Sequence, residues 1–488
     1  MKSKTLFLFL MITISLSAQE MLTLQDCKTI AIRENLSLSI DSIKIKSAIH
    51  TKRAAFANYF PDISFAGTFL HLNKQFQLFE NDILLPVVPH QAIDLNTMHI
   101  NQESFSNPMV ALLSFAIDPS TLQPLTDVNG NPVFRNYAWL PADQSKFGLK
   151  DNYLFNFSLK QPIFVGGKIF YSNKMANNSV EIAKYKTEMD KQNLLYEIED
   201  MYYKTWIIDK KCKLAHKYLE LLQEIEKDIK NYIDEGIATT NQLLMIQTKI
   251  NQAQVNLFKA ENGLTIQKQL LNQKMGRDIH QDFSLVDTID FDINIIHLII
   301  NENLDINNRP EIKLLEQKVE LSQNMLRVTQ ADMLPQIGFM ANYFFVNPNP
   351  YKGFANEFGD DYTFGVSIQI PIFHALERYN KRQAALLQYK AAQIEMNDIK
   401  NLISIETSYT TNQLKEQLMQ LNATNKNVEL ARENLRVQTD LFHEGILKLS
   451  DLTEAQTMWL QAETDYYEAY ALVLAYYAKL KKDYGIID

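Results

Sequence analysis

The stretch from Phe157 to Phe170, "FSLKQPIFVGGKIF", joins two kinds of pattern at a single proline, Pro162. Before the proline, apolar and polar residues alternate, which predicts a β-strand with one apolar face. Beyond Gly166 and Gly167, no proline or glycine occurs between Lys168 and Asp234. Because these are the residues that most often interrupt helices, the sequence predicts one very long helix over 168–234.

The same pattern recurs in "VSIQIPIFHALERY", residues 366–379, where Pro371 follows the strand. Pro162 and Pro371 lie 209 residues apart, and so do Gly236 and Gly445. A second spacing relates "FPDISFAGTF" from Phe60 to "LPQIGFMANY" from Leu334. Repetition at constant spacing indicates that the chain consists of two copies of one structural unit.

The repeat predicts a first copy over 19–275 and a second over 276–488, mainly α-helical with two β-strands in each. The strands are expected at about 62–71, 152–164, 336–346 and 361–373. The first copy carries an insertion over 81–150, and the second an equatorial segment over 277–309. The helices are expected at 24–58, 168–234, 237–275, 310–333, 376–443 and 446–484.

Helix lengths suggest how the helices stack, at about 1.5 Å of rise per residue. Each long helix is matched in length by two shorter ones placed end to end. We expect the helix over 237–275 to be continued by the one over 310–333. The helix over 446–484 is then completed by the N-terminal helix over 24–58.

The first twenty residues have the pattern of a secretory signal peptide. Lys2 and Lys4 precede an apolar run that ends in Ser17 and Ala18, which predicts cleavage after residue 18. Gln19 would begin the mature chain, so no lipid anchor is expected there. The formal net charge is −9, which argues against a nucleic-acid partner.

The sequence offers no recognisable site for enzymatic chemistry. Cys27 and Cys212 form neither a disulfide framework nor a metal motif, and the nine histidines show no ligand spacing. No phosphate-binding glycine loop or nucleophile motif is present. We therefore expect a protein without enzyme activity, cofactor or metal.

The segment "DVNGNP", Asp127 to Pro132, has the start of a calcium-binding loop. Its sixth position, where such loops need glycine, is Pro132, and Ala138 stands where a glutamate would chelate the ion. We expect a tight turn around Asn129 and Gly130 instead.

The four predicted strands have about ten residues each, the length of a tilted membrane-spanning strand. Four strands cannot close a barrel, and an open sheet in lipid would leave backbone groups without hydrogen-bond partners. Three copies would supply twelve strands, enough for a pore. The alternative is a sheet half-buried on a soluble helical core.

Taken together, the signal peptide, the two "PIF" junctions, Gly166 and Gly167, and the paired glycines Gly236 and Gly445 make the chain similar to the TolC family of outer-membrane efflux proteins. The resemblance implies a homotrimer in the outer membrane that extends into the periplasm. A 12-stranded β-barrel would continue into an α-helical barrel. It also implies export of small molecules or polypeptides in a tripartite efflux or type I secretion system. The partners would be outer-membrane lipid, a periplasmic adaptor and an inner-membrane transporter of RND or ABC type.

A second functional class stays open on the sequence alone, namely a periplasmic helical adaptor or scaffold without its own pore. Four amphipathic strands distinguish the two, because an adaptor has no need of lipid-facing Tyr and Phe.

The resemblance also implies roles for residues near the paired glycines. Asp451 and Glu454, together with Gln242, would form the pore constriction. The alternative is that both acids merely favour the start of a helix. Phe442 and Leu447, with Gln242, stand where related proteins lock the channel shut, so that lock is missing from this sequence.

Two further sets of residues follow from the resemblance. The adaptor would dock at the tips, Gly236, Ile237, Gly445 and Ile446. The strand–helix junctions would be at Pro162, Gly166, Gly167 and Pro371. At the second junction, His374 and Ala375 are expected to occupy positions where glycine is frequent.

Overall fold

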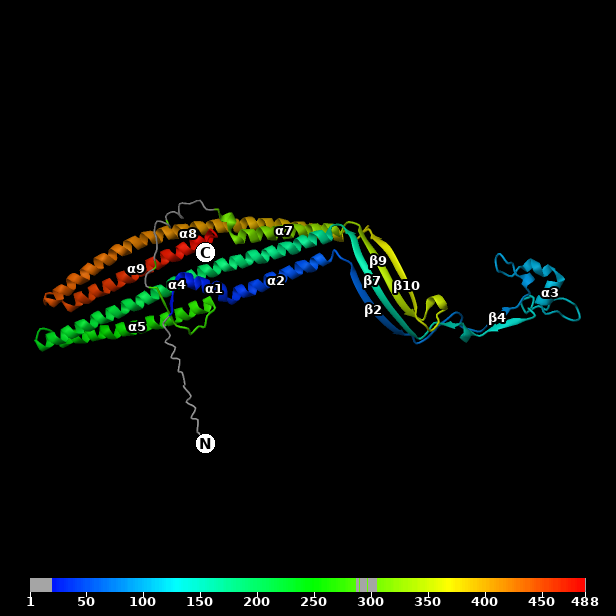
Figure 1. Ribbon diagram of the computed structural model, residues 1–488, viewed down its shortest axis with the longest axis horizontal. Coiled ribbons are helices and arrows are strands. Elements are labelled where there is room, and N and C mark those ends of the chain that lie inside the picture. Colours follow the sequence, from blue (N-terminus) through cyan, green and yellow to red (C-terminus); the bar gives the residue numbers. More distant parts are fainter. Residues whose placement is uncertain (1–19, 287–288, 290–295, 297–304, 488) are drawn as a thin grey trace, which may run out of the picture. The chain divides into compact units, whose positions relative to one another are not determined.

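The computed structural model describes residues 20–286, 289, 296 and 305–487 (Figure 1). The predicted signal peptide and most of the equatorial segment therefore lie outside the described residues. The chain forms two compact units. The helical unit contains the chain up to Ala57, Gly166–Leu334 and the chain from Pro371, and the sheet unit contains Asn58–Val165 and Pro335–Ile370.

The helical unit is built from long helices that lie side by side (Figure 1). The two repeats have matching lengths, because α4 and α8 have 67 residues each, and α2 and α7 have 22 each. A short parallel pair, β1 (Glu20–Leu22) with β8 (Phe283–Leu285), and the 3-10 helix η4 (Ile306–Asn308) belong to the same unit. The helices are α1 (Leu24–Glu34), α2 (Leu36–Ala57), α4 (Lys168–Asp234), α5 (Thr240–Met275), α7 (Pro310–Ala331), α8 (Glu377–His443) and α9 (Leu449–Asp483).

The stacking of the shorter helices differs from the expectation. The side-chain amide of Asn35, directly before α2, donates to the carbonyl of Lys274 near the end of α5 at 2.9 Å. Gly276 lies so close to this joint that a Cβ there would be 2.5 Å from the carbonyl oxygen of Glu34. Helix α5 is therefore continued by α2, so the expected stacking of α5 on α7 is wrong.

The second joint brings the end of α9 to the start of α7. A Cβ on Gly485, directly after α9, would lie 3.6 Å from Cα of Arg309, which precedes α7. The sequence could not distinguish the two pairings, because either one gives the same total length. The pseudo-twofold arrangement remains, with the two shorter partners exchanged.

Several helix boundaries also differ from the predicted ones. The helix expected over 24–58 is two helices separated at Asn35, whose side-chain oxygen accepts from the backbone N–H groups of Ser37 and Leu38. Helices α5 and α9 begin three residues later than expected, at Thr240 and Leu449. The residues after each tip glycine are used to complete the turn and are not free to continue into a helix.

The sheet unit contains a four-stranded antiparallel sheet in the order β10–β9–β7–β2, and Figure 1 shows its strands curving side by side. The last strand ends at Gln369, although residues up to 373 were expected in it. Pro371, which has no N–H group, follows two residues later. The 3-10 helix η5 (Pro350–Lys352) lies between the last two strands. The strands are β2 (Asp62–His71), β7 (Asp151–Val165), β9 (Gln336–Asn347) and β10 (Gly359–Gln369).

One face of β10 is apolar and uncovered. Tyr362, Phe364, Val366 and Ile368 alternate along the strand, and each is 61 to 72% exposed. The outer strands β2 and β10 each pair on one side only within the described sheet. The sheet thus presents an exposed apolar face and two open edges. None of the helices among the described residues combines the length and apolarity of a membrane span.

The insertion between β2 and β7 is a two-stranded stalk that carries a small folded head. Two short strand pairs form the stalk, β3 with β6 and β4 with β5. The elements are β3 (Phe76–Gln77), β4 (Ile83–Pro86), η1 (His90–Ala92), η2 (Gln102–Ser106), α3 (Pro108–Ser114), β5 (Tyr137–Leu140), η3 (Ala142–Ser145) and β6 (Lys146–Phe147).

Candidate functional site: the helical tips and the strand–helix junctions

The first tip is a tight turn between α4 and α5. The backbone N–H of Gly236 donates to the carbonyl of Ile233 at 3.0 Å, and that of Ile237 donates to Tyr232 at 2.7 Å. These two bonds form a Schellman motif, whose left-handed residue is here glycine, with φ of +76°. Glycine adopts this conformation without the steric cost of a side chain.

The second tip, between α8 and α9, repeats this geometry. Gly445 donates to Phe442 at 3.0 Å, and Ile446 donates to Leu441 at 3.1 Å. A Cβ on either tip glycine would meet no atom within 4 Å. The isoleucines that follow are 67% exposed at Ile237 and 69% exposed at Ile446. Each tip therefore presents an open glycine beside an exposed apolar side chain.

A shared apolar core lies behind the two tips. It combines residues of all four helices, so the two hairpins form one packed body. Its buried members are Leu222, Ile225, Ile229, Ile246, Ile250, Ala253, Phe442, Leu449 and Leu452. The separation of the tips is therefore fixed by side-chain packing.

The three residues at the lock positions have other partners within the chain. Phe442 is buried in this shared core, where its ring lies 6.2 Å from that of Tyr232, and Leu447 packs against the same core. The side-chain oxygen of Gln242 accepts from the backbone N–H of Thr239 at 2.8 Å, which completes a capping box at the start of α5. These contacts stabilise the hairpins.

Two contacts between the hairpins were not expected from the sequence. The hydroxyl of Tyr232 donates to the carbonyl of His443 at 3.4 Å, and Nδ1 of His443 lies 3.7 Å from a carboxylate oxygen of Asp228. No sequence motif predicts either contact, because the partners are brought together only by packing of α4 against the end of α8.

Asp451 and Glu454 lie on exposed turns at the start of α9. Ser450 donates to the carboxylate of Asp451 at 2.8 Å, and within the described chain neither acid has an ion-pair partner. The residue that precedes α9, Lys448, makes no side-chain cap. At the corresponding position of the first repeat stands the neutral Gln242. The helix that follows the tip thus begins with acidic side chains in the second repeat only.

At the first strand–helix junction, two consecutive glycines adopt left-handed conformations, with φ of +64° at Gly166 and +83° at Gly167. A Cβ on Gly166 would lie 2.6 Å from the carbonyl oxygen of Ala331. Pro162 lies within β7, where the register with β9 shifts between Pro162 and Phe164. Gly166 is therefore required both by its backbone and by the space around it.

The second junction has the same backbone without glycine. Ala375 and Leu376 have φ of +43° and +65°, and they correspond to the two glycines of the first junction. The sequence placed the glycine-like positions at His374 and Ala375, whereas the structure has them one residue later. Arg378 donates to the carbonyl of Asp332 at 2.5 Å, and Lys168 pairs with the side chain of Asp332 at 2.8 Å.

A buried acid lies at the joint between α9 and α7. Asp483 is fully buried and accepts from the hydroxyl of Thr410 at 2.7 Å, while Nη1 of Arg309 is 4.0 Å from its other oxygen. Burial raises the pKa of the Asp483 carboxyl, and neighbouring Glu406 adds to the rise. The bond from Thr410 and the charges of Arg309 and Lys479 oppose it.

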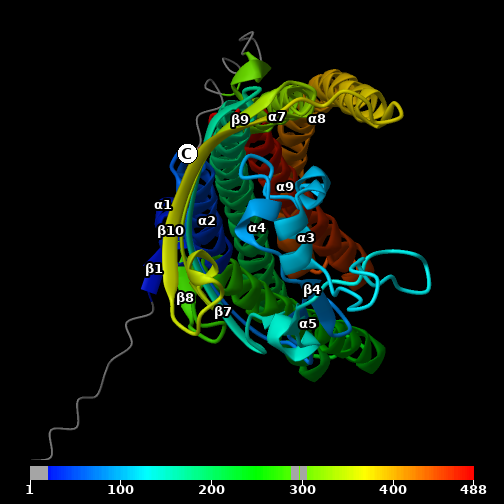
Figure 2. The ribbon, with the colours of Figure 1, turned by 90° about the vertical axis from the view of Figure 1, so that its right-hand side faces the viewer.

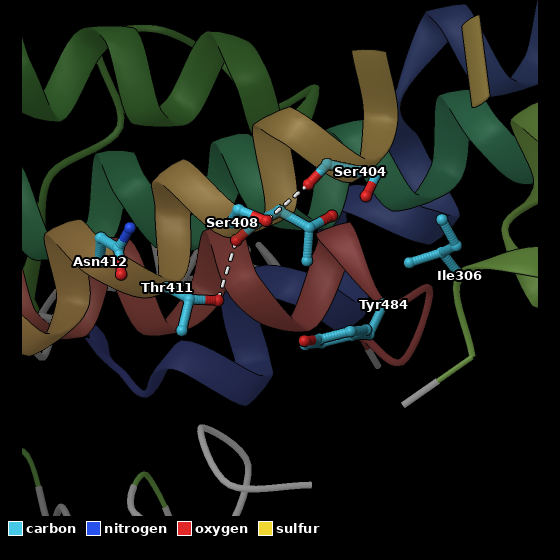
Figure 3. Close-up of a pocket in the computed structure, with 7 residues that line it drawn as sticks. Ile306, Ser404, Ser408, Thr411, Asn412 and Tyr484 are labelled. Carbon is cyan, nitrogen blue, oxygen red and sulfur yellow. Dashed lines mark hydrogen bonds between the residues drawn. The ribbon is translucent and has the colours of Figure 1, made fainter. Parts of the chain in front are cut away.

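A polar pocket of about 530 Å³ lies beside the same joint (Figure 3). Two of its hydroxyl groups donate to their own helix, Ser408 to the carbonyl of Ser404 at 2.9 Å and Thr411 to that of Thr407 at 2.8 Å. These two hydroxyl groups therefore have no hydrogen atom left to donate to a ligand. None of the residues that line the pocket has a charged side chain. These are Ile306, Ser404, Thr407, Ser408, Thr411, Asn412 and Tyr484.

The cysteines and the segment that resembles a calcium-binding loop have structural roles in this chain. Cys27 and Cys212 are buried, and burial raises the pKa of the Cys27 thiol to about 12. No cluster of possible metal ligands occurs among the described residues. Asp127 accepts from the backbone N–H groups of Asn129 and Asn131, so the segment with a calcium-like start is a turn, with Gly130 at φ of +86°.

Comparison with known proteins agrees with this architecture. Residues 303–485 match the model of the family described as outer membrane efflux protein. No curated protein matches the chain by sequence.

Several solved structures share the fold over almost the whole chain. They include the outer membrane protein VceC of Vibrio cholerae, with a TM-score of 0.68 and 14% identity over 95% of this chain and 96% of that one. The CmeC outer membrane channel of Campylobacter jejuni has a TM-score of 0.69 and 13% identity, over 95% and 86%. The MtrE outer membrane channel of Neisseria gonorrhoeae has a TM-score of 0.65 and 13% identity, over 95% of this chain and 88% of that one.

The fold is therefore that of the outer-membrane channels. Together with the match over residues 303–485, it confirms the resemblance of this chain to the TolC-type outer membrane efflux proteins. The matched family and structures are transport proteins and not enzymes, in agreement with the expectation from the sequence.

Proposed function

We propose that three copies of this chain form an outer-membrane channel whose helical part is a periplasmic conduit. The channel exports small molecules or polypeptides together with a periplasmic adaptor and an inner-membrane transporter of RND or ABC type. The similarity to outer-membrane channels and the efflux family match support this function.

The observation that carries the proposal is the four-stranded sheet with an exposed apolar face and two open edges. Lipid would cover the apolar face of the sheet, but unpaired strand edges in lipid have no hydrogen-bond partners. Pairing β10 of one copy with β2 of the next removes both edges. Three copies then give the twelve strands expected from the sequence.

An adaptor or scaffold without its own pore is the alternative. It explains the long helices, but it gives no reason for a sheet whose Tyr362, Phe364, Val366 and Ile368 all remain exposed. The fold shared with outer-membrane channels over 94 to 95% of the chain also favours the channel.

We further propose that the tips, Gly236, Ile237, Gly445 and Ile446, are the docking surface for the adaptor. The open space around both glycines and the exposed isoleucines support this assignment. Asp451 and Glu454 are proposed to line the constriction of the conduit, with Gln242 at the equivalent position of the first repeat.

Leucine at each tip tests the docking surface. We expect Gly236→Leu and Gly445→Leu to abolish export while trimers remain in the outer membrane. A Cβ there meets no atom of its own chain within 4 Å, so the added side chain is expected to block the partner and not the fold. Export of a dye or drug from cells and trimer content of membranes are measured side by side.

Gly130→Leu is the matched control. Gly130 also has a left-handed backbone and no atom within 4 Å of a Cβ, but it lies in the insertion. The backbone strain, about 1–2 kcal/mol, is therefore similar in all three variants. Loss of export in the control, or normal export by both tip variants, would contradict the docking assignment.

A further inference from the structure

The insertion has an unusual balance of charge. Between Glu80 and Asp143 the sequence contains seven acidic residues, a single arginine, Arg135, and no lysine. Residues 87–136, beyond the stalk, are called the head here. Acidic residues are no denser here than in the rest of the chain, but the near absence of basic residues leaves a net negative charge, which favours cationic partners and opposes anionic ones.

The head has its own small core. The ring of Phe115, which is buried, lies 4.7 Å from that of Phe105 and 5.2 Å from that of Phe134. Ala92 and Val110 are also buried. The head is thus a packed body with a defined surface.

One face of helix α3 in this head is apolar and largely exposed. Met109, Leu112 and Leu113 are 63, 49 and 46% exposed. Their spacing of three and four residues places them on one side of the helix, while Val110 and Ser114 face the core of the head. Figure 2 shows α3 among the loops of the head.

Two hairpin turns of the head add exposed apolar side chains beside acidic groups. Met98 and Leu122 adopt left-handed conformations, with φ of +55° and +58°, and are 76 and 79% exposed. Each turn begins with an aspartate, Asp94 or Asp118, whose carboxylate accepts from a backbone N–H two residues later. These bonds lower the pKa of both carboxyls and thereby favour their charged form.

We propose that the head binds a cationic amphipathic polypeptide segment. The apolar face of α3 (Met109, Leu112 and Leu113) would receive its apolar side chains, and the acids of the head would pair with its lysines and arginines. A second copy of the head is disfavoured because it carries the same negative charge. A lipid surface rich in phosphate is disfavoured for the same reason.

The binding of such a segment does not rest on the proposed channel function. The full-length protein in detergent is therefore tested with a fluorescent 18-residue amphipathic peptide of Lys and Leu, by fluorescence anisotropy. We expect binding that weakens as salt rises. We expect much weaker binding of a Glu–Leu peptide, which reverses the charge, and of a Lys–Ser peptide, which lacks the apolar face.

Substitutions on α3 locate the site. Met109→Ser with Leu112→Ser and Leu113→Ser should weaken binding of the Lys–Leu peptide at least about tenfold, since burial of even one such side chain corresponds to roughly that factor. The matched control, Met109→Leu with Leu112→Met and Leu113→Met, keeps the face apolar and should retain binding. Replacing residues 87–136 by a short Gly–Ser turn between the paired strands β4 and β5 should abolish it.

Three outcomes would overturn the proposal. The first is unchanged peptide binding by the serine variant or by the protein without its head. The second is spontaneous disulfide linking of heads in Leu122→Cys without peptide binding, which would assign the surface to a second copy. The third is head-dependent binding to lipopolysaccharide vesicles but not to the peptide. Channel conductance of the same variants, expected to be unchanged, separates these results from failure of the proposed function.

Discussion

The two strand–helix junctions adopt the same left-handed backbone with different residues, and the residues differ in the conformational cost of that backbone. Gly166 and Gly167 adopt left-handed conformations freely, whereas Ala375 and Leu376 adopt them against the contact of Cβ with the backbone. Both residues of the second junction are exposed. Neither therefore recovers this cost by burying its side chain.

Glycine at the second junction should consequently stabilise the protein. We expect Ala375→Gly and Leu376→Gly each to raise the free energy of unfolding by up to about 1 kcal/mol, after the greater flexibility of glycine in the unfolded chain is deducted. Thermal unfolding followed by circular dichroism measures the change. Gly166→Ala is the opposite control and should be strongly destabilising, because its Cβ would lie 2.6 Å from the carbonyl oxygen of Ala331.

The buried carboxyl of Asp483 predicts a pH-dependent penalty. Because burial raises its pKa in the folded state, the folded protein holds this proton more tightly than the unfolded chain does. Below the ordinary pKa of 3.8, Asp483 therefore does not lower the free energy of unfolding. As pH rises from 3.8 to the raised pKa, Asp483 lowers this free energy by an increasing amount. Above that value the penalty is complete.

Asp483→Asn removes this titration, and its amide oxygen can still accept from Thr410. We expect the variant to gain thermal stability relative to the wild type at pH 7 and to gain less at pH 4. Arg309 keeps Glu311 as its partner at 3.2 Å. A gain that is equal at both pH values would show that Asp483 does not titrate in this range.

At the scale of elements, the acids at the start of α9 have two possible roles, stabilisation of the helix and selection of ions in the pore. Negative charge in the first turn of a helix stabilises the helix through its dipole, wherever the helix lies. A ring of acids in a pore instead favours cations. Both effects need the charges of Asp451 and Glu454, but they give different measurements.

If these acids line the constriction, Asp451→Asn with Glu454→Gln should lower the cation preference of channels in planar bilayers. It should also weaken block by multivalent cations. Reversal potentials in a salt gradient measure the preference. Glu395→Gln with Asp398→Asn, also three residues apart on an exposed helix surface, lies about 70 Å from the tip along α8 by helical rise and should have a smaller effect. An unshifted potential with a small loss of thermal stability would leave only the dipole effect.

The elements also show what the sequence can and cannot specify. The lengths of the repeated helices follow from proline, glycine and apolar spacing, which act locally. The stacking of α5 on α2 does not, because it depends on Asn35 reaching the carbonyl of Lys274, far away in the chain. The late starts of α5 and α9 depend on hydrogen bonds within the tip turns, which spacing alone does not reveal.

The candidate site was predictable to the same extent. The tip glycines and the first junction stand out as repeated punctuation of the sequence. The contact of Tyr232 with His443 has no such signal. The left-handed backbone at Leu376 is not marked by glycine, but its spacing of 209 residues from Gly167 points to it. The head of the insertion has no counterpart in the second repeat, so the repeat gave no guide to its fold.

At the scale of the whole molecule, both units leave surfaces that another copy would cover. The sheet unit has open edges at β2 and β10. In the helical unit, α8 exposes Ile405 at 65%, and α5 exposes Phe258 at 65%. Exposed apolar side chains on long helices are expected where neighbouring subunits pack. Assembly of copies is therefore the condition on which the proposed channel depends.

Native mass spectrometry of the detergent-solubilised protein tests this condition most directly. The account predicts a single species with three times the mass of the mature chain. It should resist dissociation when detergent and protein are diluted, because separation would expose six strand edges at about one backbone hydrogen bond per paired residue. A stable monomer, or a dimer that persists across concentrations, would contradict both the closed barrel and the pore.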